Sequence, residues 1–361
     1  MADDAQQRLR AFSFQVYSKL EGAFTAGMIH LGDQLGLYRA LAEPGGPMTS
    51  DELAEATGLQ ERWVREWLHN QAAARLLELS SDGDGPDRFA MSGEARAVLA
   101  TPEHPAFGMG MFHRLPQTMR ALEVMPESFA TGVGHDYDSH GPEGAVGIER
   151  SFEPWNRHNL IRTVLQEMDG VVERLRDGAA VADVGCGAGG AVLLMAEAFP
   201  NSTFVGYDIS RHALERADAK LADSGLSNAR FVDPRDEPLP VDGSVDLATT
   251  FDCIHDMAHP SPAIEAIRAA LGDDGHWLLV DIHAAETLAD NIALNPMAPL
   301  LYGVSVLSCM SSALSEPGGE GLGTLGLPAS KAEEMAKAAG FTRFATLDVR
   351  HPMNAFYEIR P

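Results

Sequence analysis

The sequence predicts an α/β fold, a doubly wound and mostly parallel seven-stranded sheet, preceded by an all-α winged-helix domain. From Ala179 onward, apolar runs of strand length alternate with helical segments, which is typical of a parallel sheet covered by helices on both faces. Before that point, apolar residues recur at helical spacing. A chain of 361 residues is long enough for one full-sized domain and a smaller one.

Seven segments carry the strand pattern, and the last two predict the direction of the final strand. The segments are residues 179–185, 202–208, 229–233, 244–251, 276–282, 344–349 and 354–359. Only RHPM separates the sixth segment from the seventh, which is too short for a crossover connection. We therefore expect the seventh strand to run antiparallel to the sixth.

Residues 1–100 have the pattern of a winged helix. Apolar residues at helical spacing run from Phe12 to Leu41. In the next unit, Thr49 and Glu52 fit a capping box and introduce a pair of helices. The stretch LLELSSDGDGPDRFAMS then predicts two short strands around a Gly/Asp turn, which completes the winged-helix pattern.

The charge of the chain argues against nucleic acid as a partner of this domain. With 27 Lys and Arg against 52 Asp and Glu, the net charge of −25 repels phosphate backbones and anionic lipid surfaces. Asp82, Asp84 and Asp87 add negative charge to the wing, where a duplex would lie. We expect a dimerisation or pocket-closing domain in a homodimer, with a ligand-sensing transcriptional regulator as the less favoured alternative.

The remaining chain divides into a bridge and a sheet-bearing domain. Residues 101–178 predict a helical bridge, in which the irregular stretch 131–147 is expected to be a mobile loop over a site. Residues 179–361 form the ligand-binding domain. Within it, residues 297–327 begin with the uncharged run MAPLLYGVSVLSCM, which predicts an interface helix or a lid over the substrate.

The termini and cysteines predict a cytoplasmic protein. The start MADDAQQRLR lacks the apolar core of a signal peptide. Cys186, Cys253 and Cys309 are odd in number and too widely spaced for a disulfide framework or a metal knuckle. We therefore expect three reduced thiols.

The strongest signal in the chain is the stretch VADVGCGAGGAVLLMAEAF. A buried strand ends at Val184, a glycine loop follows, and a helix opens behind it, so that backbone N–H groups face a ligand. Asp208 ends the next strand, where its carboxylate can accept hydrogen bonds from two ribose hydroxyls. This pattern predicts a nucleoside-bearing cofactor.

Two cofactors fit the glycine pattern. GCGAGG satisfies the dinucleotide fingerprint, so an NAD(P)-dependent oxidoreductase is the alternative function. Asp183, two residues before the first glycine, would repel a pyrophosphate, and the reversed last strand is a further departure. S-adenosylmethionine fits better, because it has no phosphate and its ammonium group needs a carboxylate or carbonyl partner.

These segments resemble class I S-adenosylmethionine-dependent methyltransferases. VADVGCGAGG, FVGYDIS, PLPVDGSVDLATTFDCIHDM and LLVDIHAAE are similar to successive motifs of that family. The winged helix and the stretch YGVSVLSCMSSALSEPGGEGLGTLG resemble, more narrowly, actinobacterial-type small-molecule methyltransferases. The resemblance implies methyl transfer to an O, N or S atom of a small organic molecule.

The resemblance also implies which residues surround the cofactor. We expect cofactor binding by Asp183, Gly185, Cys186, Gly187, Gly189, Asp208, Ile209, Asp236, Phe251 and Asp252. In this assignment the glycines line the methionine part, Asp208 holds the ribose and Ile209 lies against the adenine. One position departs from the family, because Arg235 stands where an acidic residue is usual. Asp236 is therefore our choice for the adenine-side contact.

His255 and His259 have the spacing of the H-E-x-x-H zinc motif, with Asp256 in place of the glutamate. Metal binding by this motif requires both histidines on one helix face. SPAIEAIRAAL instead predicts a new helix with Ser261 as N-cap and Pro262 at its first position, which leaves His259 in the preceding loop. No downstream third ligand stands out, so we expect no metal.

His255 is our candidate for the catalytic base. It lies beyond the carboxyl end of the fourth predicted strand, where ligands meet an open α/β sheet. An imidazole with an ordinary pKa of about 6.5 suits removal of a proton from a hydroxyl or ammonium acceptor. Asp256 is expected to orient this imidazole. In the alternative interpretation, His255 only shapes its loop through a backbone hydrogen bond.

Four more side chains are expected to line the substrate pocket. Trp155, Asn156 and His158 lie shortly before the first strand of the sheet, and an aromatic face beside a sulfonium gives an attraction of about 0.5–2 kcal/mol. Trp155 fits the hydrophobic core equally well. Tyr302 lies in the apolar segment and could supply a polar contact. The surrounding composition favours a small, largely hydrophobic acceptor.

Overall fold

The computed structural model describes residues 2–81, 83 and 85–361. The chain divides into two compact units, Met1–Pro116 and Gln117–Pro361. Their boundary falls inside the bridge predicted for residues 101–178, so the first part of that segment belongs to the N-terminal unit and the rest to the sheet-bearing unit. No helix in the described part of the chain is both long and apolar enough to span a membrane.

The N-terminal unit contains the predicted winged helix. Its elements are α1 (Ala2–Gln34), α2 (Leu37–Ala42), α3 (Ser50–Thr57), α4 (Glu61–Ala73), β1 (Glu78–Ser80), β2 (Arg88–Ala90), α5 (Gly93–Leu99) and α6 (Met109–His113). β1 and β2 pair antiparallel and form the wing. Of the three acidic residues predicted for the wing, Asp87 is exposed, and Asp82 and Asp84 lie outside the described residues.

Local hydrogen bonds explain the start of α3 and the attachment of α1. The predicted capping box is confirmed, because the Glu52 N–H donates to Thr49 Oγ1 at 3.2 Å and the Thr49 N–H donates to Glu52 Oε2 at 2.8 Å. Trp67 of α4 donates its indole N–H to the Met28 carbonyl at 2.8 Å. These bonds fix the helix start and anchor the C-terminal part of α1 to α4.

The C-terminal unit is built on a seven-stranded sheet with the strand order β5-β4-β3-β6-β7-β9-β8. The strands are β3 (Ala180–Val184), β4 (Thr203–Tyr207), β5 (Ala229–Val232), β6 (Val245–Phe251), β7 (Leu271–Ile282), β8 (Arg343–Thr346) and β9 (Asn354–Arg360). β9 pairs antiparallel with both neighbours, and the pairs from β5 through β7 are parallel. The predicted reversal of the last strand is confirmed.

Helices precede, connect and follow these strands. They are α7 (Leu115–Arg120), α8 (Met125–Thr131), α9 (Gly141–Asn159), α10 (Val171–Asp177), α11 (Gly190–Ala198), α12 (Arg211–Ser224), α13 (Pro260–Ala270), α14 (Leu288–Leu294), α15 (Ala298–Val304), α16 (Met310–Ala313) and α17 (Ala329–Ala338). Short 3-10 or π turns complete them: η1 (Ala121–Glu123), η2 (Tyr137–His140), η3 (Leu160–Val164), η4 (Leu165–Glu167), η5 (Ile254–Asp256) and η6 (Ser305–Cys309).

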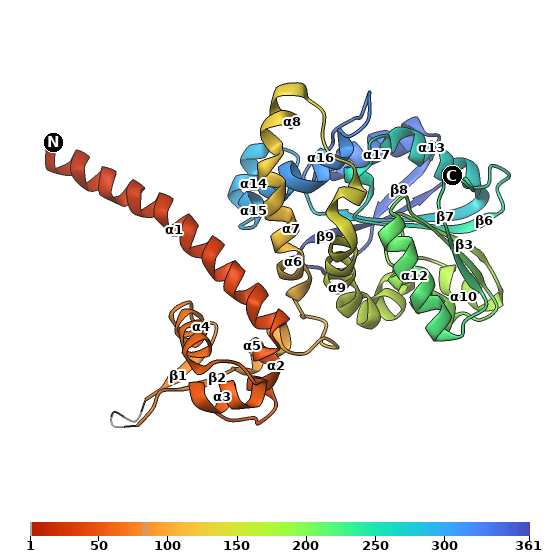
Figure 1. Cartoon of the computed structure of the whole chain (residues 1–361). Helices are drawn as coiled ribbons and strands as arrows, with labels where there is room; N and C mark the ends of the chain where they lie inside the picture. The colour runs from red at the N-terminus through yellow and green to blue at the C-terminus, as the bar shows by residue number, and fades with distance from the viewer. Residues whose placement is uncertain (1, 82, 84) are drawn as a thin grey trace. The chain divides into compact units, whose positions relative to one another are not determined.

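The strands are apolar on both faces because helices cover both (Figure 1). Alternate residues of one strand join different cores, as the pleat requires. In β7, Leu278 packs with α10 and α11, whereas Leu279 packs with α13 and α17. This layering leaves the carboxyl ends of β3, β4, β6 and β7 free to carry functional loops.

Two predicted details differ from the structure. The stretch 131–147, expected to be a loop, forms the turn η2 and the start of α9. The helix after His259 begins at Pro260 with His259 as its N-cap residue, so Ser261 is not the cap. Ser261 instead donates its hydroxyl to Glu320 Oε2 at 2.8 Å. A partner distant in sequence thus replaces the local cap.

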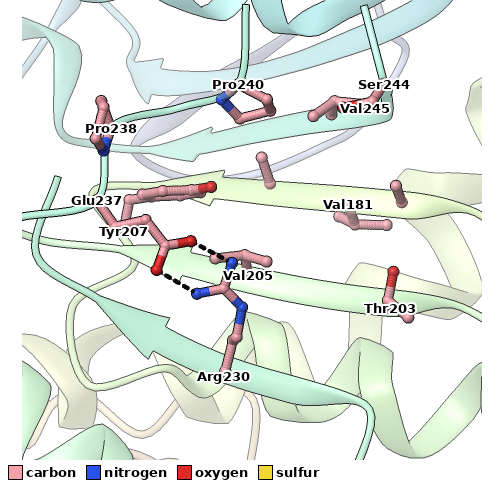
Figure 2. Close-up of a pocket in the computed structure, with 12 residues that line it drawn as sticks. Val181, Thr203, Val205, Tyr207, Arg230, Glu237, Pro238, Pro240, Ser244 and Val245 are labelled. Atoms are coloured by element: carbon pink, nitrogen blue, oxygen red, sulfur yellow. Dashed lines mark hydrogen bonds and ion pairs between the residues drawn. The ribbon is translucent and has the colours of Figure 1, made fainter. Parts of the chain in front are cut away.

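A cavity of about 260 Å³ lies on the sheet at β3, β4 and the loop between β5 and β6 (Figure 2). Residues 233–244 connect those two strands without a helix, which leaves this face thinly covered. Arg230 and Glu237 form a bidentate ion pair at its edge, with distances of 2.9 and 2.5 Å. None of the predicted site residues lines this cavity; most of them lie at or beyond the carboxyl ends of the strands.

Candidate active site

Three glycines with left-handed backbone build the loop between β3 and α11. Gly185, Gly187 and Gly189 have φ of 73°, 53° and 72°. A Cβ on Gly185 would lie 2.6 Å from Cβ of Cys253, and one on Gly189 would lie 2.4 Å from the ring of Phe231. A Cβ on Gly187 would meet nothing within 4 Å. Gly185 and Gly189 therefore permit close packing, whereas Gly187 borders open space that a ligand can use.

Asp208 ties this glycine loop to the loop after β4. Its Oδ2 accepts the N–H of Gly187 and its Oδ1 accepts the N–H of Ser210, both at 2.8 Å. Burial raises the pKa of Asp208, and the two backbone N–H groups oppose that rise. Each carboxylate oxygen can accept more than one hydrogen bond. Asp208 can therefore shape the loop and still accept ribose hydroxyls.

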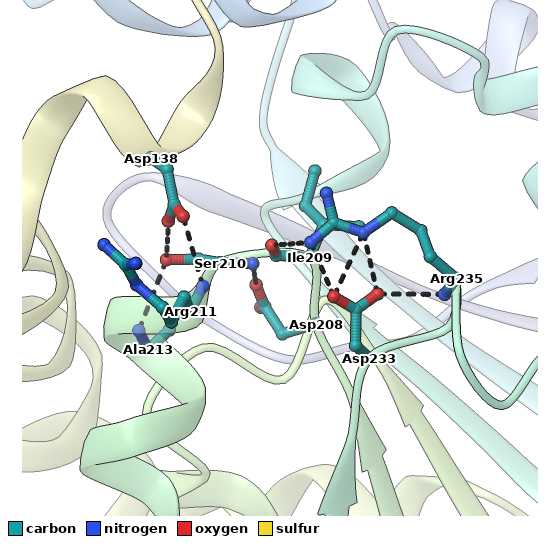
Figure 3. A network of polar contacts seen from close by, with 8 residues as sticks. All are labelled: Asp138, Asp208, Ile209, Ser210, Arg211, Ala213, Asp233 and Arg235. Atoms are coloured by element: carbon teal, nitrogen blue, oxygen red, sulfur yellow. Dashed lines mark hydrogen bonds and ion pairs between the residues drawn. The ribbon is translucent and has the colours of Figure 1, made fainter.

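A second carboxylate reaches the loop after β4 from the segment 131–147. Asp138 in η2 accepts the hydroxyl hydrogen of Ser210 at 2.6 Å, at the N-terminus of α12 (Figure 3). At the end of η2, Nε2 of His140 lies 2.9 Å from Oγ of Ser308 in η6. The segment therefore links the Asp208 loop with the predicted lid.

Arg235 occupies the adenine side of the predicted cofactor site (Figure 3). Its guanidinium pairs with Asp233 at 2.5 Å and donates to the Ile209 carbonyl at 2.8 Å. The Ile209 side chain is 49% exposed, as a residue lying against a ligand requires. Asp236 is exposed on the same turn. Its contact with adenine stays a prediction.

Asp183 is a buried acid near the end of β3. Its side chain is 1% exposed, and Oδ1 accepts the hydroxyl hydrogen of Thr249 at 2.6 Å. Oδ2 has no hydrogen-bond partner among the described residues. Burial raises the pKa of Asp183 to about 7, and the charge of Asp208 adds to that rise. Its pairing with a ligand ammonium group stays a prediction.

His255 and Asp281 form a buried pair at the carboxyl ends of the neighbouring strands β6 and β7. Nδ1 of His255 lies 2.5 Å from Oδ1 of Asp281, and the side chains are 3% and 1% exposed. Burial opposes the imidazolium, but Asp281 and the sulfur of Cys309 outweigh this and raise the pKa of His255 well above its usual value. Asp281 engages Nδ1, so Nε2 is left to accept a proton. Nδ1 is thus held by an acid of the adjacent strand, and the orienting role expected of Asp256 stays a prediction.

Asp252 follows β6 in a strained conformation. Its φ of 50° is uncommon for a residue with a side chain. The side chain accepts a hydrogen bond from Asn354 of β9, and the backbone N–H donates to the Val280 carbonyl at 2.9 Å. Burial and the nearby Asp281 raise the pKa of Asp252. Strain and crowded carboxylates of this kind gather at functional sites.

The predicted lid segment, residues 297–327, brings a cysteine to the histidine. One ligand-type atom each of His255, Asp256 and Cys309 lies within 4.8 Å of the others. Tyr302 of α15 is 36% exposed. Cys309 of this segment thus lies beside the His255 side chain, and a substrate contact by Tyr302 stays a prediction.

The three residues expected from α9 have different environments. Trp155 packs edge-on against His351 with ring centroids 4.6 Å apart, and its centroid lies 5.6 Å from that of Phe356. Asn156 is buried and His158 is exposed. The structure thus shows Trp155 in core packing, and contact of these residues with a substrate stays a prediction.

The sheet brings most predicted residues to one edge, but sequence reasoning missed several partners. Cys186 is buried and Phe251 is half-buried at the ends of β3 and β6. Asp281 could have been found as an acid that ends a strand next to the one carrying His255. No sequence pattern indicated a role for Asp138, because nothing in its spacing predicts the helical turn that directs its side chain toward Ser210.

Comparison with known proteins decides between the cofactors left open by the glycine pattern. A methyltransferase-domain family model matches residues 175–313, and an Rv2258c-like winged HTH domain model matches residues 23–99. A mitomycin biosynthesis 6-O-methyltransferase of Streptomyces lavendulae is 27% identical over 272 residues, which cover 73% of this chain and 75% of the relative. The chain is an S-adenosylmethionine-dependent methyltransferase.

Solved structures share the fold of this methyltransferase over nearly its whole length. A mitomycin 7-O-methyltransferase has a TM-score of 0.69 at 21% identity, covering 98% of this chain and 99% of that one. Human N-acetylserotonin methyltransferase, in complex with S-adenosylmethionine, has a TM-score of 0.67 at 16% identity, covering 96% and 97%. At such identities the likeness shows the fold.

The buried acid Asp183 predicts a pH-dependent stability of the methyltransferase. Its folded pKa of about 7 exceeds the unfolded value of about 3.9, so wild-type stability falls as pH rises between these values. Asp183→Asn removes the ionisable group. Its stability relative to wild type should be greater at about pH 8 than at about pH 5, by on the order of 2 kcal/mol.

Urea unfolding of both proteins at the two pH values measures this gain. Asp242→Asn, at an exposed turn carboxylate, is the control and should show no such difference. An equal gain at both pH values would contradict the account of Asp183.

Proposed function

We propose that the methyltransferase acts on an oxygen atom of a small, largely hydrophobic molecule. The observation that carries the proposal is the buried His255–Asp281 pair at the sheet edge where ligands bind. A hydroxyl acceptor needs a base for its proton, and an imidazole held at Nδ1 supplies one. The O-methyltransferase of Streptomyces lavendulae supports oxygen as the acceptor atom.

The residues around the glycine loop fit S-adenosylmethionine. The open space beside Gly187 and the remaining acceptor capacity of Asp208 suit its methionine and ribose parts. The carboxylates at this edge of the sheet suit S-adenosylmethionine, which is a cation and has no phosphate. We assign cofactor binding to Asp183, Gly185, Cys186, Gly187, Gly189, Asp208, Ile209, Asp236, Phe251 and Asp252. When bound, the cofactor supplies the electrophilic methyl group.

His255 takes the proton of the acceptor hydroxyl at Nε2. Asp281 stabilises the imidazolium that forms, because its carboxylate accepts the hydrogen at Nδ1. Loss of this proton makes the acceptor oxygen a stronger nucleophile, and S-adenosylmethionine would supply the methyl group and leave as S-adenosylhomocysteine. Residues 297–327, with Tyr302, are our choice for the lid that positions the acceptor and keeps water out. Asp256 adds negative charge beside the imidazole.

Replacement of the base tests this mechanism. His255→Ala should lower kcat by about 10²- to 10⁴-fold, because only the proton transfer is lost. The Kd of S-adenosylhomocysteine should stay within about twofold of wild type. Transfer of a labelled methyl group to a panel of phenols and alcohols first identifies an acceptor, and calorimetry measures the Kd.

The matched control for the base is His259→Ala. His259 pairs with Glu316 at 3.2 Å and is 42% exposed, so its loss should leave kcat unchanged. A wild-type kcat in His255→Ala, or an equal fall in both variants, would exclude His255 as the base.

We also propose that the protein is a homodimer formed through α1. The N-terminal part of this helix carries large apolar side chains that are 52–76% exposed: Leu9, Phe12, Phe14, Val16, Tyr17, Leu20 and Phe24. Such a number of large exposed apolar side chains on one helix is typical of an interaction site. A second copy offers the same surface, and two such helices cover each other.

Charge introduced on α1 tests the dimer. Phe14→Asp combined with Phe24→Asp places two carboxylates in the proposed contact, so the protein should sediment as a monomer in analytical ultracentrifugation. Phe129→Asp in α8 is the matched control, since this phenylalanine is 77% exposed outside α1, and it should stay dimeric. A wild-type protein that sediments as a monomer would overturn the proposal.

We place the protein in the cytoplasm. Its three cysteines, Cys186, Cys253 and Cys309, are free thiols, which suits a reducing compartment. The expected partner is the small acceptor molecule.

A further inference from the structure

We propose that His255, Asp256 and Cys309 form a binding site for a thiophilic divalent cation, with Zn²⁺ as the best match. Zinc takes imidazole nitrogen, thiolate sulfur and carboxylate oxygen at about 2.0–2.3 Å, so the ligand atoms of one ion lie about 3.5 Å apart. The three side chains already place one such atom each within 4.8 Å of the others. Small rotamer adjustments bring them onto one ion.

The folded chain holds the two halves of this site together. His255 and Asp256 lie in η5, and Cys309 ends η6, which packs against η5. The N–H of Gly323 donates to the His255 carbonyl at 3.0 Å, and the N–H of Glu320 donates to the Ala258 carbonyl at 2.9 Å. The segment that follows Cys309 is thus fastened to the histidine loop. The ion would bind the folded state selectively.

The partner of the histidine strengthens the assignment. Zinc-bound histidines usually donate their second ring N–H to a carboxylate, which fixes the ring and increases its basicity. Asp281 already holds Nδ1 of His255 at 2.5 Å, so Nε2 is available to the metal. The other oxygen of Asp281 is buried without a hydrogen-bond partner among the described residues.

This site differs from the zinc motif that the sequence suggests. His259 is the N-cap residue of α13 and pairs with Glu316, and it does not belong to the cluster. The third ligand is Cys309, which lies in a different element. If Nε2 of His255 is also the proposed base, as the proposed function assumes, a bound zinc ion would block methyl transfer by occupying that lone pair.

Titration of the chelator-treated full chain with Co²⁺ tests the site. A thiolate bound to Co²⁺ gives a charge-transfer band in the near ultraviolet, which reports Cys309 directly. We expect a band that saturates at about one ion per chain and disappears when Zn²⁺ is added. Cys309→Ser should abolish the band, and Asp281→Asn should weaken binding by about 10- to 100-fold.

Two further variants make the test specific. Asp256→Asn should weaken binding and retain the band, whereas His259→Ala should bind like wild type. Circular dichroism melts confirm that each variant is folded before its titration. A missing band in wild type, an unchanged band in Cys309→Ser, or loss of the band in His259→Ala overturns the site.

Methyl transfer measured with and without Zn²⁺ separates this proposal from the proposed function. Inhibition that Cys309→Ser relieves supports both. Full activity of the zinc-loaded chain supports the metal site and overturns the assignment of His255 as base. Inhibition without the Co²⁺ band overturns the metal site alone.

Discussion

Two backbone N–H groups from different loops converge on the carboxylate of Asp208, and the shape of the glycine loop depends on that contact. Gly187 and Ser210 follow β3 and β4, which are neighbours in the sheet. Because Asp208 is buried, its charge must be satisfied by fixed donors, and these donors set the shape of the glycine loop. Gly187, which makes this contact through its N–H, has a left-handed φ and open space beside it.

A second centre forms one strand further along the same sheet edge, and packing couples it to the first. Asp281 reaches His255 because β7 pairs in parallel with β6. The pairing of β9 with β7 likewise brings Asn354 to Asp252. Gly185 leaves room for Cys253, two residues before His255, so the glycine loop and the histidine loop touch. A substitution that shifts the backbone of one loop should therefore also shift the other.

The parts that sequence predicted best rest on local patterns. Apolar runs of strand length predicted the sheet. The four-residue link RHPM predicted the reversed last strand, because so short a link cannot make a crossover. The capping box of α3 was also visible, since its two residues bond only with each other. The three glycines followed from the strand–loop–helix unit of β3 and α11, and Asp208 from its place after the next strand, β4; cofactor binding by these residues stays a prediction.

The partners that sequence missed are set by contacts between distant segments. Asp281 meets His255 through strand pairing, while adjacency in the chain favoured Asp256. Asp138 meets Ser210 only after the stretch 131–147 forms a helical turn. The helix α13 begins at Pro260, and the hydroxyl of Ser261, expected to cap it, bonds instead to Glu320, far along the chain. Such partners depend on the assembled sheet, so no local pattern encodes them.

The most direct measurement is calorimetric titration of S-adenosylhomocysteine into wild type, Asp208→Asn and Asp242→Asn. Asp242 also accepts a local N–H, that of Ser244 at 3.2 Å, but it lies before β6 at the opposite end of that strand. S-adenosylhomocysteine should bind Asp208→Asn at least about tenfold more weakly than wild type, since a charged acceptor for the loop and the ribose is lost. Asp242→Asn should bind like wild type. Equal affinity of all three proteins would contradict the role given to Asp208.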